Sequence, residues 1–198
     1  MGPSRRPSAM IGYQEARLSE TRDKLVLRLD RPILAFMAAL GLGGCFGSRE
    51  TLIGPAESLK LFGERGQAQR VHIGDFNGPN ETLAYSWAGS AYRFTDEDGR
   101  ADPAQYRLAP FTGPWMLTER LEHGVSVYGL ARRESGRLWT YSPQCKDLTD
   151  SEIRAAQLDL TLNGTCWIGS AAQLRRAMQL ILAHNPRPDG YFELQGAH

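Results

Sequence analysis

The chain has 198 residues, of which 41% are hydrophobic and 23% charged, which is typical of one globular domain and excludes a disordered or fibrous protein. The formal net charge of +1 is unevenly distributed, because residues 1–44 carry +3 and residues 45–198 carry −2. Since the body is near-neutral and has no basic patch, the charge argues against a nucleic-acid partner.

An uncharged apolar run occupies residues 33–42 and follows two basic residues, Arg28 and Arg31. A transmembrane helix needs about 20 apolar residues, so this run is too short to span a bilayer. Its length matches the apolar core of a secretory signal peptide, which is about 7–15 residues long. The sequence therefore predicts that residues 1–44 form a leader that is removed on export.

The run ends in Leu42-Gly43-Gly44-Cys45, which resembles the lipobox of bacterial lipoproteins. The resemblance covers residues 28–45 and implies that a dedicated signal peptidase cuts before Cys45. It further implies that Cys45 carries acyl chains of the palmitate type, and two such chains give stable membrane anchoring. By resemblance to sorting in enteric bacteria, Phe46 instead of aspartate after this cysteine slightly favours the outer membrane, with the protein on its periplasmic face.

The first part of the leader departs from the lipoprotein pattern, because residues 1–27 are long and polar for a signal peptide and include three acidic residues. We therefore expect the true translation start near Leu25 or Val26, with a long basic region as the alternative. The competing interpretation is a cytosolic protein in which residues 33–42 form a buried helix and residues 41–47 a loop.

Three regions are expected: the leader at 1–44, a tether with a short helix at 45–69, and a folded domain at 70–198. Residues 46–50 are predicted to be flexible. From about residue 70 apolar and polar side chains alternate, which is the strand signature. Strands are predicted, in chain order, at residues 83–87, 92–94, 106–108, 115–119, 125–132 and 137–141.

The C-terminal third mixes helix and strand signals. Thr149 and Glu152 have the spacing of a capping box that opens a helix ending near Gln157, and Asn163-Gly164 predicts a hairpin turn. A second helix is predicted after Ser170, with an apolar face of Leu174, Ala177, Met178 and Ile181. Residues 191–194 are predicted to return as an edge strand. The expected fold class is α+β, an antiparallel β-meander packed against the C-terminal helix.

Two cysteines remain once Cys45 is assigned to the lipid. In an oxidising compartment Cys145 and Cys166 are expected to form a disulfide. For a cytosolic chain the alternative is two free thiols with a redox or metal role. No closely spaced cysteine pair indicates structural zinc.

The sequence predicts no catalytic residue, no cofactor and no metal site. The acidic segment 96–102 matches an EF-hand poorly and is expected to be a solvated loop, with calcium binding as the alternative. The four histidines form no motif with a serine elbow. The aromatic side chains along the predicted sheet are expected to serve in packing, with a ligand groove as the alternative; they are Tyr85, Trp87, Tyr92, Trp115, Tyr128, Trp139 and Tyr141.

These observations favour a membrane-anchored envelope lipoprotein with a non-enzymatic binding or structural role. Its expected partners are the membrane, through the lipid, and an envelope protein, a glycan or a small ligand. The alternative is an exported hydrolase whose site uses dispersed histidine, aspartate and serine residues.

Overall fold

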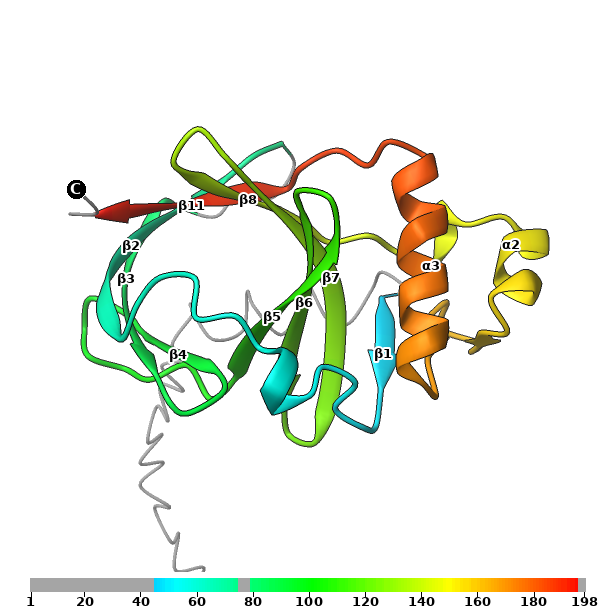
Figure 1. The fold of residues 1–198 in the computed structure, drawn as a ribbon, viewed down its shortest axis with the longest axis horizontal. Helices are drawn as coiled ribbons and strands as arrows, with labels where there is room; N and C mark the ends of the chain where they lie inside the picture. The colour runs from blue at the N-terminus through cyan, green and yellow to red at the C-terminus, as the bar shows by residue number, and fades with distance from the viewer. Residues whose placement is uncertain (1–44, 75–78, 196–198) are drawn as a thin grey trace, which may run out of the picture.

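A computed structural model describes residues 45–74 and 79–195 (Figure 1). The predicted leader, residues 1–44, therefore lies outside the described residues, and so do the buried-helix alternative for residues 33–42 and His198.

Eight of the described strands form a closed antiparallel barrel, because β6 pairs with both β5 and β7 and so joins the two ends of the sheet. In order around the barrel the strands are β2 (Arg65–His72), β3 (Glu81–Trp87), β4 (Tyr92–Thr95), β5 (Gln105–Thr112), β6 (Trp115–Glu122), β7 (Val125–Glu134), β8 (Arg137–Tyr141) and β11 (Gly190–Gln195). Closure removes the unpaired edges that an open meander would expose.

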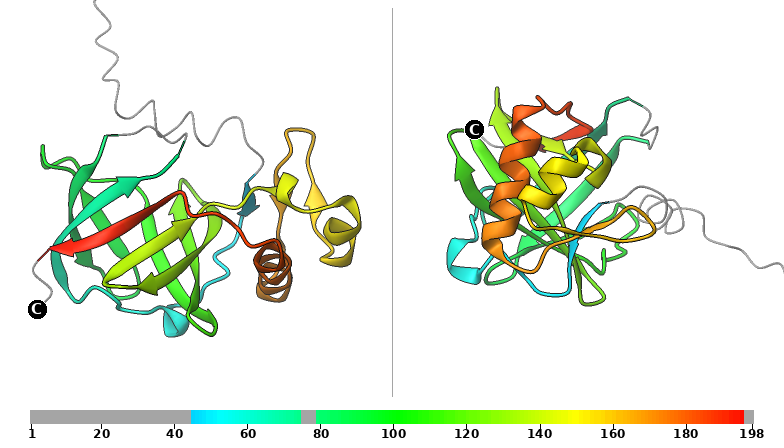
Figure 2. Two further views of the ribbon diagram at one scale, coloured as in Figure 1. Left: turned by 90° about the horizontal axis from the view of Figure 1, so that it is seen from above. Right: turned by 90° about the vertical axis from the view of Figure 1, so that its right-hand side faces the viewer.

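The prediction of an α+β fold is wrong, because β11 closes the sheet into a barrel. The sequence predicts an edge strand at 191–194, but β11 pairs with β2 on one side and with β8 on the other. It therefore completes the barrel where an open sheet was expected. The C-terminal helix α3 (Ala171–Ala183) packs outside the barrel and covers the part of its wall near β1 and β7 (Figures 1 and 2).

The barrel interior is filled by one apolar cluster. Cross-strand partners such as Ala68 with Leu83 and Tyr85 with Phe94 lie on the same face of the sheet and belong to this cluster. Since such pairs recur around the barrel, that face is the inner one. Tyr92 is fully buried there and packs against Tyr85 with ring centroids 5.8 Å apart.

A second apolar cluster lies outside the barrel wall. The predicted face of α3, with Leu174, Ala177, Met178 and Ile181, is buried against Phe46, Leu130 and neighbouring residues. This confirms the apolar face that the sequence predicts for the helix.

A small three-stranded flap branches off the barrel beside α3. β1 (Phe46–Ser48) pairs antiparallel with the first half of β7 and parallel with β10 (Cys166–Trp167), which pairs with β9 (Asp159–Leu160). The second half of β7 pairs with β8, so β7 changes partner near Gly129. A side chain at Gly129 would meet the carbonyl oxygen of Tyr141 at 2.7 Å, so glycine lets the two partners diverge there.

The prediction of a flexible tether at residues 46–50 is wrong for its first three residues. Phe46, Gly47 and Ser48 form β1 and are all buried, with Phe46 completely so. A short helical segment does follow, as a 3₁₀ turn at Pro55–Glu57.

Two short helical segments lie between β8 and β9. They are a 3₁₀ turn at Cys145–Asp147 and the helix α2 (Asp150–Ala155), and Thr149 and Glu152 form the predicted capping box of α2. No helix among the described residues is long and apolar enough to cross a bilayer.

Candidate functional site

The three cysteines of the chain lie at one place, where the flap meets the 3₁₀ turn after β8. Cys145 and Cys166 form the predicted disulfide, with Cα atoms 5.4 Å apart. Cys45 pairs with Gln144 in an isolated bridge, and its carbonyl oxygen accepts a hydrogen bond from the Cys166 backbone amide at 3.0 Å. The disulfide therefore holds the strand partner of β1 in place directly beside Cys45.

Cys45 is the free cysteine of this group and is partly exposed. Successive side chains of a strand point to opposite faces, and the next residue, Phe46, is buried in the outer core. The Cys45 thiol therefore lies on the opposite face from Phe46, so modifying its sulfur need not disturb the core.

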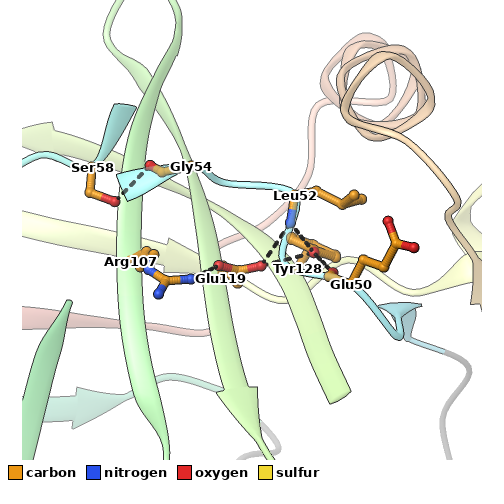
Figure 3. A network of polar contacts seen from close by, with 7 residues as sticks. All are labelled: Glu50, Leu52, Gly54, Ser58, Arg107, Glu119 and Tyr128. Carbon is orange, nitrogen blue, oxygen red and sulfur yellow. Dashed lines mark hydrogen bonds and ion pairs between the residues drawn. The ribbon is translucent and has the colours of Figure 1, made fainter. Parts of the chain in front are cut away.

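A buried polar network fixes the segment that follows β1 to the barrel wall (Figure 3). The Leu52 backbone amide donates to the Tyr128 hydroxyl at 3.0 Å and to Glu119 Oε1 at 3.2 Å. The Tyr128 hydroxyl lies 2.9 Å from Glu119 Oε1 and 2.9 Å from the Glu50 carbonyl oxygen. Arg107 forms an ion pair with the other Glu119 oxygen at 3.0 Å.

The side chains of this network are largely buried, and burial makes their charges depend on one another. The Glu119 side chain has no exposed surface and that of Arg107 is 12% exposed, so each charge depends on the other for compensation. Burial, and secondarily the Glu119 carboxylate, raises the pKa of the Tyr128 hydroxyl, which stays protonated and can donate. The chain after Cys45 is thus held by β-pairing and then by this network.

A row of large side chains crosses the outer face of four strands. Trp115, Arg132, Trp139 and Tyr191 are successive cross-strand partners on β6, β7, β8 and β11, and we call them the tryptophan–arginine row. The Arg132 guanidinium lies 5.2 Å from the Trp115 ring centre, a cation–π contact, and pairs with Glu134 at 2.6 Å.

Two adjoining open hollows lie at the end of this row, between the barrel and the loop that leads from α3 to β11. Their volumes are about 450 and 370 Å³, and they share Tyr141, Asn185, Pro186 and Arg187. Six of the seven aromatic residues named from the sequence divide into two groups, and the seventh, Tyr128, belongs to the polar network around Glu119. Tyr85, Trp87 and Tyr92 pack together in the barrel interior, while Trp115, Trp139 and Tyr141 line the hollows.

The histidines are dispersed. His72 lies on β2, where burial and the nearby Arg70 lower its pKa, and His123 lies in an exposed turn 3.5 Å from Glu122. His184 ends α3 and contacts Glu152 at 2.8 Å.

The Thr149 hydroxyl also lies close to the His184–Glu152 pair. The three groups are arranged as in a helix cap and not as in a catalytic triad. Thr149 Oγ1 donates to Glu152 Oε2 at 2.8 Å, so the carboxylate lies between the hydroxyl and the imidazole. In a hydrolytic triad the imidazole occupies that middle position. The contact therefore orients the first turn of α2 and does not assemble a nucleophile.

The acidic segment 96–102 forms the loop between β4 and β5 and uses its carboxylates locally. Asp96 Oδ1 accepts from the Arg100 amide at 2.7 Å, and Asp102 accepts from the Ala104 amide and the Tyr106 hydroxyl at 2.8 and 2.6 Å. In the described part of the chain, no group of three or more histidine, cysteine or acidic side chains is placed to hold a metal ion.

Comparisons with protein-family models, with curated protein sequences and with solved structures find no match to this chain.

Proposed function

We propose that the protein is an exported lipoprotein, anchored in the bacterial cell envelope by acyl chains on Cys45, and that its barrel has a non-enzymatic binding or structural role. The observation that carries the proposal is the position of Cys45. The cysteine that ends the lipobox-like sequence Leu42-Gly43-Gly44-Cys45 immediately precedes β1, so a lipid on its sulfur would be attached directly beside the flap.

Two further features support export. The Cys145–Cys166 disulfide is typical of oxidising compartments and rare in the cytosol. It occupies the other two cysteines of the chain, which leaves Cys45 available for a lipid. The acyl chains would hold the protein at the membrane without a transmembrane helix.

Phe46 has a packing role in the structure, which is independent of any role in membrane sorting. Its side chain is completely buried in the outer core, where an aspartate would be a desolvated, unpaired charge. The absence of aspartate at this position therefore follows from packing. The proposed address is accordingly the periplasmic face of an envelope membrane, and the outer membrane rests on the resemblance alone.

For the binding role we assign the tryptophan–arginine row and its hollows as the contact surface. Tryptophan rings offer flat apolar faces, and Arg187, which lines both hollows, adds a positive charge beside the Arg132–Glu134 ion pair, a combination enriched at binding hot spots. A partner with a flat apolar group next to an acidic group would match this surface.

Metabolic labelling tests the anchor. The full-length chain, expressed in a lipoprotein-processing bacterium fed an alkyne fatty acid, should take up the label, and Cys45→Ser should abolish it. The matched control is the double variant Cys145→Ser/Cys166→Ser, which removes two thiols but should keep the label. A wild-type chain without label, or a labelled Cys45→Ser variant, would refute the anchor.

A further inference from the structure

The hairpin tip between β9 and β10 is an exposed apolar feature beside the proposed anchor. Leu162 in this turn is fully exposed, and Leu160 on β9 is 54% exposed, whereas large hydrophobic residues elsewhere in the described chain are mostly covered. Figure 2 shows the hairpin extending from the body of the molecule next to β1.

The pairing of the flap strands places this tip level with Cys45. Phe46 is the partner of Cys166 in the parallel pair of β1 and β10, and Cys166 is the partner of Leu160. Thr161 and Thr165 therefore lie at the level of Cys45, and Leu162 lies one residue further out, in the direction opposite to the course of β1. One strand residue corresponds to about 3.3 Å.

Hydrogen bonds within the turn fix its backbone, so the position of Leu162 is defined. The Thr161 amide donates to the Thr165 carbonyl at 2.9 Å and the Gly164 amide to the Thr161 carbonyl at 3.0 Å, while Thr161 Oγ1 donates to the Thr165 carbonyl at 3.0 Å. Asn163-Gly164 thus makes the predicted turn. Several polar groups of the turn are hydrogen-bonded to one another, whereas the Leu162 side chain projects without cover.

We infer that the β9–β10 tip inserts Leu162 into the surface of the bilayer that holds the Cys45 lipid; this inference rests on the proposed function. A lipid on Cys45 would emerge directly from a strand of the folded domain, because no spacer separates Cys45 from β1. The membrane surface then lies at the level of the tip. The headgroup region of each leaflet is about 5–8 Å deep, so a leucine whose backbone is about 3.3 Å beyond Cys45 lies within this region, and its side chain extends toward the hydrocarbon.

The consequence is a fixed orientation. One contact through acyl chains would allow the barrel to tumble, whereas a second contact through Leu162 sets the flap toward the membrane. β4 and the acidic loop after it lie across the barrel from β1 (Figure 1), far from the flap that would make the membrane contact.

The test uses the full-length protein, processed in cells and reconstituted into vesicles of phosphatidylethanolamine and phosphatidylglycerol with spin-labelled lipid. Leu162→Cys supplies a thiol for an environment-sensitive fluorophore, and Asp98→Cys, in the exposed loop after β4, is the matched control. We expect quenching at position 162 to exceed quenching at position 98 by at least about threefold.

The outcomes separate the two claims. Equal quenching at both positions would overturn the insertion of Leu162. A shielded fluorophore at 162 that lipid does not quench would indicate contact with a second copy of the chain and would also overturn it. If the parent chain, without an added cysteine, takes the fluorophore at Cys45, the anchor itself is refuted and the inference falls with it.

Discussion

At the residue scale, two sets of contacts constrain the chain after Cys45: the strand pairing of β1 and the polar network around Glu119. β1 is fully buried, and after it Tyr128 contacts the backbone at Glu50 and Leu52, while Glu119 contacts it at Leu52 (Figure 3). A lipoprotein with a long linker lets its domain move freely over the membrane. In the proposed lipoprotein the acylated residue, Cys45, would directly precede β1, so events at the membrane would act on that strand.

Truncating Glu119 should be among the most damaging single changes to stability. Glu119→Ala leaves the Arg107 guanidinium without its ion-pair partner in a buried site, and we expect a loss of about 3–5 kcal/mol in the free energy of unfolding. Tyr128→Phe removes only the hydroxyl and should cost about 1–3 kcal/mol. Both values are measured by urea unfolding of the full-length protein.

The control for this prediction is Glu134→Ala, which breaks the exposed ion pair with Arg132. Surface pairs contribute below about 1 kcal/mol, so this variant should remain close to the wild type. If Glu119→Ala unfolds at the same urea concentration as Glu134→Ala, the network does not hold the segment as described.

At the element scale, α2 depends on its N-terminal cap. Glu152 Oε2 accepts from the Thr149 backbone amide at 2.8 Å and from the Thr149 hydroxyl, while Oε1 contacts His184. These hydrogen bonds, the backbone one first, lower the pKa of Glu152 from its ordinary value of 4.5 to about 2. The cap therefore joins α2 to the end of α3.

This pKa predicts a specific acid dependence. Because the Glu152 pKa is lower in the folded protein than in the unfolded chain, its contribution to stability is complete above pH about 4.5 and is lost as the pH falls toward 2. Glu152→Gln should lose less stability than the wild type over this interval. Urea unfolding at pH 7, 4 and 3 measures the difference.

Asp150→Asn is the matched control, since it removes a carboxylate from the same helical turn and leaves the capping box intact. Its pH dependence should parallel that of the wild type. A Glu152→Gln curve that runs parallel to the wild type instead would show that the cap carboxylate does not titrate as described.

At the scale of the whole molecule, closure of the barrel depends on β11 fitting between β2 and β8. Gly190 begins this strand, and a side chain there would meet the Val71 carbonyl oxygen at 2.5 Å. The contact is with backbone, which cannot move aside without breaking the β2–β11 pairing.

Gly190→Ala should therefore destabilise the fold by about 1–3 kcal/mol, the usual cost of overpacking. Gly54→Ala is the control, because Gly54 has an ordinary φ of −66° and open space around its Cα. Thermal unfolding compares the two variants. Equal midpoints would mean that β11 is not tightly seated and that the barrel closes less firmly than the pairing indicates.

Local features of this fold could be predicted from the sequence, because they depend on neighbouring residues. The alternation in Leu83–Trp87, the cap at Thr149 and the apolar face of α3 are examples, and the structure confirms each. β2 lacks such a signal at its start, since its inward positions Gly66 and Ala68 are too small to produce hydrophobic alternation.

Long-range pairing could not be predicted in the same way. The alternation in residues 191–194 indicates a strand but not that the strand has two partners, which decides between an open sheet and a barrel. The disulfide between Cys145 and Cys166 could be predicted from the sequence. The tryptophan–arginine row could not, because it depends on the register of β6, β7 and β8. The Glu119–Tyr128 network likewise joins residues with no shared motif.

The intact mass of the protein, purified from the membranes of its native host, tests the proposed lipid anchor and the proposed cleavage together. A lipid-anchored protein should begin at Cys45, with added mass equal to a diacylglycerol and, where the host acylates the amine, a further acyl chain. Thiol counting without reductant should find no free cysteine. A protein that keeps residues before Cys45 and an unmodified thiol at that position would contradict the anchor and the membrane orientation derived from it.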